Sequence, residues 1–133
     1  MTRIEDTRYL LDTHTAIWYF NGSTRLSQTA SRIMQDASSA LFVSIASAWE
    51  IAIKVGIGKL DIDGRTADFI HDAEINGIVI LPIETAHLSA LESLPLIHRD
   101  PFDRLLVATA IAEQMTIITA DKDIAKYPVS HLW

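Results

Sequence analysis

The chain has 133 residues, the usual size of one domain, and 49% of them are hydrophobic, which is enough for one sizeable core. It has no cysteine, which excludes disulfides and thiolate metal sites. Its formal net charge of −6 argues against a basic nucleic-acid-binding surface, although bound divalent cations would offset part of that charge.

The apolar segments of the chain are short. The longest charge-free stretches, such as 105–112, are far too short to cross a bilayer. The first residues contain no apolar segment typical of an export signal. With the lack of cysteine, these features predict a cytoplasmic protein without a membrane association.

The first half of the chain alternates between apolar runs, which predict strands, and amphipathic stretches, which predict helices. In chain order we predict a strand at 8–11, helices at 13–20 and 27–37, a strand at 41–44 and a helix at 45–55. Thr13 is expected to cap the first helix and Asn21-Gly22 to end it. The apolar face of the third helix is expected to comprise Ile45, Ala48, Trp49, Ala52 and Ile53.

The second half continues this alternation. We predict a helix at 66–76, a strand at 78–81, helices at 84–94 and 101–114, a strand at 115–119, a short helix at 121–126 and a strand at 129–132. Pro101 suits the first position of its helix. Alternation of this kind predicts a three-layer α/β/α sandwich with a mostly parallel central sheet. No repeat or linker is visible, so we expect one domain over 1–133.

Four acidic residues lie near strand ends or helix starts: Asp12, Glu50, Asp103 and Asp121. In parallel α/β sheets, ligands bind beyond the carboxyl ends of the strands. Carboxylates gathered there repel one another unless a cation balances them, and oxygen ligands suit Mg²⁺ or Mn²⁺. The pattern therefore predicts a metal site, and the metal indicates chemistry on phosphate.

Each acid also has an ordinary structural explanation. An acid at a helix start can cap the helix or complement its dipole, and Glu50 can pair with Lys54 one turn later. For a single acid this explanation is the commoner one, and the joint position of the four favours a site. Thr119 and Ser44, hydroxyl residues at two strand ends, are candidates to hold the carboxylates in place.

The order and spacing of these motifs resemble the PIN-domain family and, within it, the VapC-type toxins of bacterial toxin–antitoxin pairs. The similarity runs nearly from end to end. The matching segments are Leu10-Leu11-Asp12-Thr13-His14, residues 43–54, Gly58-Lys59-Leu60, His98-Arg99-Asp100-Pro101-Phe102-Asp103-Arg104 and Thr119-Ala120-Asp121.

The resemblance implies a metal-dependent endoribonuclease, the toxin of its pair, with Asp12, Glu50, Asp103 and Asp121 as the catalytic and metal-binding acids. We expect Asp12 and Asp103 to hold the principal Mg²⁺ or Mn²⁺, Glu50 to orient it, and Asp121 to help hold a second ion or a water. The resemblance also implies a homodimer and a small cognate antitoxin. Whether one ion or two act is left open.

Several neighbours of the acids have two interpretations. Asp100 is either a further outer ligand or only a helix cap, and His14 either contacts substrate or is a partly buried helix residue. Basic side chains near the acids either hold RNA phosphates or are solvated charges: Arg99, Arg104, Lys54, Lys59 and Lys122.

The aromatic run 18–20 lies on one short helix and cannot face inward throughout. At least one of Trp18, Tyr19 and Phe20 is expected at the surface, where an antitoxin or a second subunit would cover it. Packing beneath the second helix is the competing explanation.

Three other functions remain as alternatives. A receiver-like phosphorelay domain also binds Mg²⁺, but it needs an acceptor aspartate after a central strand, and the strand at 78–81 runs into Pro82 instead. A non-catalytic PIN-like binding module is the second alternative, and a nuclease acting on DNA is the third. The choice of RNA rests on the family resemblance.

Overall fold

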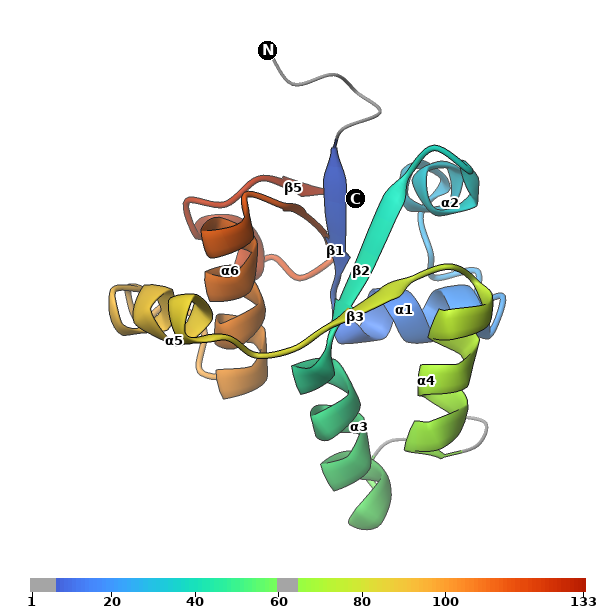
Figure 1. Ribbon diagram of the computed structural model, residues 1–133, viewed down its shortest axis with the longest axis horizontal. Coiled ribbons are helices and arrows are strands. Elements are labelled where there is room, and N and C mark those ends of the chain that lie inside the picture. The colour runs from blue at the N-terminus through green and yellow to red at the C-terminus, as the bar shows by residue number, and fades with distance from the viewer. Residues whose placement is uncertain (1–6, 60–64) are drawn as a thin grey trace.

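The central feature of the computed structural model is a sheet of five parallel strands (Figure 1). Residues 7–59 and 65–133 are described, so Leu60 of the third matching segment lies outside the described residues. The sheet order is β3-β2-β1-β4-β5. The strands are β1 (Arg8–Leu11), β2 (Ala40–Ser44), β3 (Val79–Leu81), β4 (Thr116–Ile118) and β5 (His131–Leu132).

Helices cover both faces of this sheet. Figure 1 shows α5 and α6 on one side and α1, α2 and α4 on the other, with α3 below the strands. The predicted α/β/α sandwich is confirmed, and the sheet is parallel at every pairing found. The helices are α1 (Thr13–Phe20), α2 (Gln28–Gln35), α3 (Ile45–Gly56), α4 (Thr66–Ile75), α5 (Thr85–Glu92), α6 (Pro101–Glu113) and a short 3-10 turn, η2 (Ile124–Lys126).

Successive residues of the strands feed two separate apolar cores. In β1, Leu11 joins a cluster with residues of α1 to α4, whereas Leu10 joins a cluster with residues of α6. Ile118 and Ile117 of β4 divide in the same way. This alternation follows from the two-residue period of a strand, and it explains why these strands are apolar on both faces.

The order of the strands creates a switch point between β1 and β4. The chain runs from β1 outward through β2 to β3, then returns to build β4 and β5 on the opposite side of β1. In open α/β sheets the crevice beyond the carboxyl ends at such a point is the usual ligand site. Asp12 directly follows β1 and Thr119 directly follows β4, so both lie at this crevice.

Two local predictions for the helices are wrong. Asp12, rather than Thr13, caps α1, because the Asp12 side chain accepts the backbone N–H of Thr15. The predicted apolar face of α3 is rotated away from the core: Trp49 is 56% exposed and Ile53 42%. Apart from Ala48, the face predicted to be inward is exposed, and the buried residues of α3 include the polar Ser47 and Glu50. Counting apolar residues could not predict that polar ones face inward.

Among the described residues, no helix combines the length and the apolar character needed to cross a membrane.

Candidate metal-binding active site

A pocket of about 370 Å³ lies beyond the carboxyl ends of β1 and β4. The structure brings all four acids of the predicted set to this pocket, together with Asp100. The lining also contains two basic side chains, so carboxylates outnumber cations. The lining residues are Asp12, His14, Trp18, Arg25, Glu50, Lys54, Asp100, Asp103, Ala120 and Asp121.

Asp12 is held in place by the two strands that flank the switch point. Its Oδ1 accepts the backbone N–H of Thr15 at 2.7 Å, and its Oδ2 accepts the hydroxyl of Thr119. The backbone N–H of Asp12 donates to Ile118 O of β4 at 3.2 Å. One donor to each oxygen fixes the carboxylate and leaves each oxygen a further lone pair.

Glu50 is the most deeply buried of the acids, at 2% exposure. Its Oε1 accepts the hydroxyl of Thr13 at 2.8 Å, and Thr13 Oγ1 lies 2.9 Å from Ser47 Oγ. Its Oε2 accepts Lys54 Nζ at 2.5 Å, and this hydrogen bond raises the pKa of the Lys54 ammonium. Glu50 is therefore a buried residue, and Lys54 neutralises it from one turn away.

Asp100 and Asp103 begin α6 in two different environments. Asp100 caps the helix, since its Oδ1 accepts the backbone N–H groups of Phe102 and Asp103. Asp103 lies inside the pocket. Burial, followed by the negative charges of Asp100 and Glu50, raises the pKa of the Asp103 carboxyl to about 7. Of these acids, Asp103 is therefore the one whose charge a cation would stabilise most.

His98 links Asp103 to Asp121. Its Nε2 lies 2.9 Å from Asp121 Oδ2 and 3.2 Å from Asp103 Oδ2. Burial opposes the charged imidazolium, but the hydrogen bond to Asp121 and the nearby carboxylates outweigh it and raise the pKa of His98. The pKa of Asp121 is lowered, because hydrogen bonds from His98 and from two backbone N–H groups outweigh the effect of burial.

Sequence reasoning missed Arg25, which lines the pocket, and His98, whose Nε2 lies within 3.2 Å of two acids of the pocket lining. His98 was treated as loop, although a titratable side chain two residues before the cap of an acid-bearing helix is a usable signal. Arg25 comes from the segment after α1 and is exposed. Its position depends on tertiary structure, and no sequence motif marks it.

The remaining candidates lie in different places. Ser44 caps α3 by accepting the backbone N–H of Ala46, and it has no recorded bond to a carboxylate in the described residues. His14 is exposed on α1 and lines the pocket, so it is not the partly buried residue of one interpretation. Arg104 donates to Leu94 O, away from the pocket. Three basic residues are exposed and outside the pocket lining: Lys59, Arg99 and Lys122.

The aromatic run on α1 is half-buried throughout. Tyr19 and Phe20 pack against the core, and the Tyr19 hydroxyl donates to Met34 O of α2 at 3.5 Å. Trp18 lines the pocket and contacts Trp133 edge to face, with ring centroids 5.8 Å apart. Packing beneath α2 thus accounts for Tyr19, whereas Trp18 contributes to the pocket wall.

The donors in the pocket suit a divalent cation of the Mg²⁺ class. Asp12, Glu50 and Asp103 supply carboxylate oxygens, and Mg²⁺ and Mn²⁺ prefer oxygen ligands. Burial, followed by the charges of neighbouring carboxylates, raises the pKa of Asp103, so its charged form is disfavoured in the metal-free protein. A cation held by these three acids would supply the missing charge.

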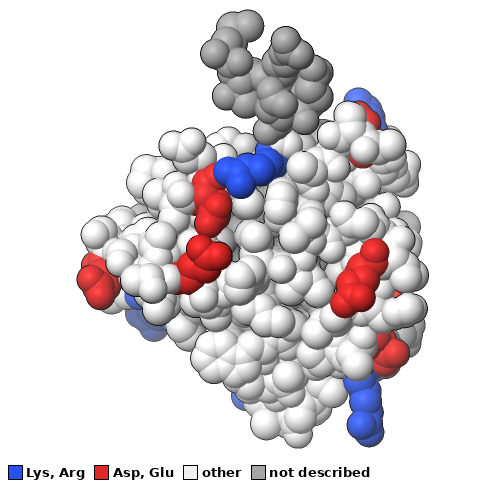
Figure 2. All heavy atoms as spheres, in the orientation of Figure 1, with Lys and Arg blue, Asp and Glu red and all other residues white. Residues whose placement is uncertain are grey.

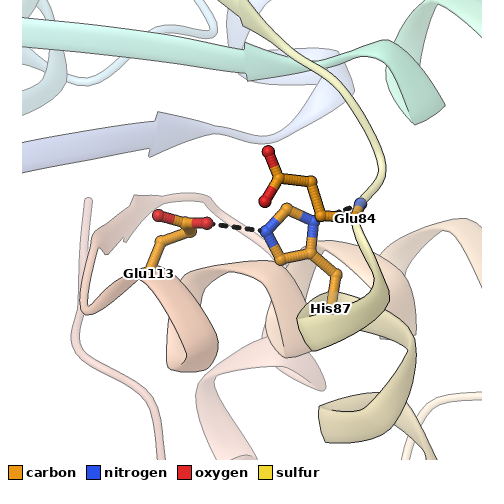
Figure 3. A group of neighbouring side chains, drawn as sticks. All are labelled: Glu84, His87 and Glu113. Atoms are coloured by element: carbon orange, nitrogen blue, oxygen red, sulfur yellow. Dashed lines mark hydrogen bonds and ion pairs between the residues drawn. The ribbon is translucent and has the colours of Figure 1, made fainter.

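A second group of histidine and acids lies between α5 and α6, away from the pocket (Figure 3). His87 is 1% exposed, and its Nε2 lies 2.8 Å from Glu113 Oε1. The backbone N–H of Glu84 donates to His87 Nδ1 at 3.1 Å. A ring with Nδ1 already accepting carries its proton on Nε2, so His87 is a donor to Glu113 and has no free nitrogen for a metal.

Comparison with known proteins agrees with this geometry. The fold is similar to a chain of VapBC2 from Rickettsia felis bound to a promoter DNA fragment (15% identity, TM-score 0.68, 95% of this chain and 98% of that chain). It is also similar to a toxin–antitoxin complex from Klebsiella pneumoniae (18%, 0.62, 94% and 96%) and to VapBC-1 from nontypeable Haemophilus influenzae (18%, 0.61, 95% and 97%).

These identities are low, so the structural likeness establishes the fold alone. A comparison with curated protein sequences found no match. Residues 9–129 match the PIN domain, which is most of the chain. With the parallel sheet and the acids at its switch point, this match shows that the chain belongs to the PIN domain family.

Proposed function

We propose that this chain is a Mg²⁺- or Mn²⁺-dependent endoribonuclease, the toxin of a toxin–antitoxin pair, working as a single domain over 1–133. The observation that carries the proposal is the convergence of Asp12, Glu50 and Asp103 in one pocket of a PIN-family chain. The solved complexes with similar folds are toxin–antitoxin complexes, which supports the toxin role.

The protein's part in the reaction is to fix its carboxylates before substrate arrives. A bound divalent cation lowers the pKa of its water and offsets charge on the phosphoryl oxygens. Asp12, held by Thr15 and Thr119, and Asp103, on the first turn of α6, would hold that cation. Glu50, fixed between Thr13 and Lys54, would orient it directly or through water.

Two basic residues of the pocket wall would receive the substrate phosphates. Arg25 lines the pocket and is exposed, and Lys54 keeps partial exposure beside Glu50. A cation beside the acids would reduce the negative field that otherwise repels a phosphate chain. RNA, rather than DNA, follows from the family resemblance, and a test with both substrates separates them.

The partners we propose are a cognate antitoxin and a second copy of the chain. Exposed apolar side chains recur on one face of α3, at Ile45, Trp49 and Ile53, and at Ile57 directly after the helix. Figure 2 shows a face, crossed by β3 in Figure 1, that carries few charged side chains. Exposed apolar side chains grouped as they are on α3 are typical of protein interfaces. Light scattering tests the dimer, and a monomeric mass would remove it.

The receiver-like alternative does not fit the sheet. Receiver domains have the strand order 2-1-3-4-5, whereas this sheet has the order β3-β2-β1-β4-β5. A non-catalytic PIN-like module would not need carboxylates placed around a shared pocket, so it has less support than the nuclease.

The Asp12→Asn variant tests the proposed function. We expect RNA cleavage in Mn²⁺ to fall at least about 100-fold, because the amide lacks the charge that holds the cation. Asparagine caps helices as well as aspartate does, so α1 should be preserved. Cleavage of total RNA and of single-stranded DNA would be compared in Mn²⁺ and in EDTA.

The matched control is Glu74→Gln, which removes an exposed acid on α4 and should cleave at the wild-type rate. Equal cleavage by Asp12→Asn, or full activity in EDTA, would contradict the proposal. Cleavage of DNA alone would retain the nuclease and reject RNA as the substrate.

A further inference from the structure

His98 lies beside two acids of the pocket lining, and the proposed reaction gives it no role. Its imidazole lies between two of the acids, Asp103 in the first turn of α6 and Asp121 in the segment after β4. The three side chains lie close enough to be considered as ligands of one ion. The hydrogen bonds around the ring decide between a metal ligand and a hydrogen-bond donor.

The Nδ1 atom of His98 is an acceptor. The backbone N–H of Asp100 donates to it at 3.1 Å, and a backbone N–H can only donate. The proton of the neutral ring therefore lies on Nε2, the nitrogen that faces the carboxylates. To bind a cation through Nε2, the ring would have to lose the proton on that nitrogen. The proton could not move to Nδ1, because the lone pair of Nδ1 already accepts the N–H of Asp100. His98 is thus placed as a donor.

The ring is also fixed in position. The backbone N–H of His98 donates to the Tyr127 hydroxyl at 2.8 Å, and the N–H of Ile97 donates to the same oxygen at 3.2 Å. Tyr127 is 3% exposed and belongs to the core beside α6. Tyr127 therefore anchors the backbone at His98, and a turn of the imidazole would break the ring's bonds to Asp100 N and Asp121 Oδ2.

Asp121 is nearly saturated by protein donors. Its Oδ1 accepts the backbone N–H groups of Asp123 and Ile124 at 2.8 and 3.2 Å, and its Oδ2 accepts His98 Nε2 at 2.9 Å. Asp12 and Glu50 each carry one donor per oxygen, which leaves lone pairs for a cation. Asp121 is therefore the poorest cation ligand of the four acids.

We propose that His98 is a positioning residue that ties Asp121 to Asp103 and occupies the place of a second cation, so that the site holds one divalent ion. Two-metal sites hold ions about 4 Å apart, bridged by shared carboxylates. His98 Nε2 donates to Asp121 Oδ2 at 2.9 Å and lies 3.2 Å from Asp103 Oδ2, so it stands where a second ion between these two oxygens would lie. Asp121 would then act through His98, and Asp12, Glu50 and Asp103 would hold the cation.

This inference rests on the proposed function for its metal, but its test needs no RNA. Calorimetric titration of the whole chain with Mn²⁺ should give one ion per chain. In His98→Ala the first ion should bind within about threefold of the wild-type affinity, and a second, weaker ion should appear between the freed carboxylates. His98→Gln, which keeps an N–H donor, should stay at one ion.

Four results would overturn the inference: two ions in the wild type, loss of the first ion in His98→Ala, a single ion in that variant, or two ions in His98→Gln. Nitrogen-15 NMR of the metal-free protein provides an independent test, since it should find the proton of the neutral ring on Nε2, and a proton on Nδ1 would exclude the bridge. If the wild type binds no Mn²⁺, the proposed metal chemistry fails, while the NMR result still decides the role of His98.

Discussion

Two histidines of this protein have the same local arrangement and different surroundings. In both His87 and His98, a backbone N–H donates to Nδ1 at 3.1 Å, and Nε2 faces a carboxylate at 2.8 or 2.9 Å. His87 is buried between two helices, whereas His98 lies beside Asp103 and Asp121, two acids of the pocket lining. The Nε2–H donor of His87 therefore connects α5 to α6, whereas that of His98 faces the acids beside the pocket.

The difference between the two groups is the balance of charge. Glu113, the partner of His87, also lies 3.8 Å from the Arg8 guanidinium, so its charge has two partners. Asp103, beside His98, faces three further carboxylates, and their field together with burial raises its pKa to about 7. A cluster of histidine and acidic residues indicates a metal site when the negative charge of its carboxylates is not balanced by nearby cations. Short distances between the ligand atoms are not sufficient by themselves.

The largest expected effect distinguishes the two carboxylates by activity. Asp103→Asn should lower Mn²⁺-dependent RNA cleavage at least about 100-fold, because it removes charge from the cation site. Glu113→Gln, the same chemical change in the other group, should leave cleavage within about threefold of wild type. Initial rates on one RNA substrate measure both. Comparable losses in the two variants would remove the distinction between the groups.

A measurement of the free energy of unfolding should show that His87 contributes to the stability of the fold. His87→Ala should lower the free energy of unfolding by about 2–4 kcal/mol, because it opens a cavity between α5 and α6 and leaves Glu113 without its buried donor. Urea denaturation measures this change. The matched control is His71→Ala on the exposed side of α4, expected within about 0.5 kcal/mol of wild type. A loss no greater than that of the control would show that His87 does not contribute to this stability.

The smallest expected effect concerns pH. The pKa of Asp103 is raised in the folded protein, so the folded state binds more protons than the unfolded chain between about pH 4 and 7. Its contribution to stability is thus present at low pH and is lost as the pH rises through about 7. In EDTA, the melting temperature of wild type should fall relative to that of Asp103→Asn by about 4 °C between pH 5 and pH 8.

The Asp103→Asn protein serves here as the reference, because groups that do not interact with Asp103 titrate alike in the two proteins. Parallel curves for the two proteins would mean that Asp103 is not perturbed by its neighbours.

Much of the fold follows from the sequence, because apolar runs and helical spacing are local signals. The strand at 8–11 has the predicted bounds, and Asp12 lies where a strand-end acid should. The inward face of α3 could not be predicted in the same way. Its buried Glu50 is stabilised by Thr13, which is distant in sequence, and by Lys54, and no periodicity reports such a partner.

The residues of the candidate site also differ in whether local sequence signals predict them. The positions of Asp12, Asp103 and Asp121 could be predicted because each follows a strand or begins a helix, whereas Glu50 lies one turn into α3. The contacts of His98 and Arg25 could not be predicted, because they depend on how loops approach the pocket: His98 reaches Asp121, 23 residues further along the chain. Ser44 shows the converse, since a hydroxyl at a strand end satisfied the expected pattern but serves the first turn of α3.

The carboxylate of Asp12 has a wider consequence, because it is also the cap of α1 and the bonding partner of β4. Its orientation is set once these elements fold, so the catalytic machinery we propose would be assembled without waiting for substrate or cation. The proposed activity would then require no rearrangement of Asp12. We therefore expect the protein to be inhibited by a partner molecule that covers the pocket and leaves the positions of the carboxylates unchanged.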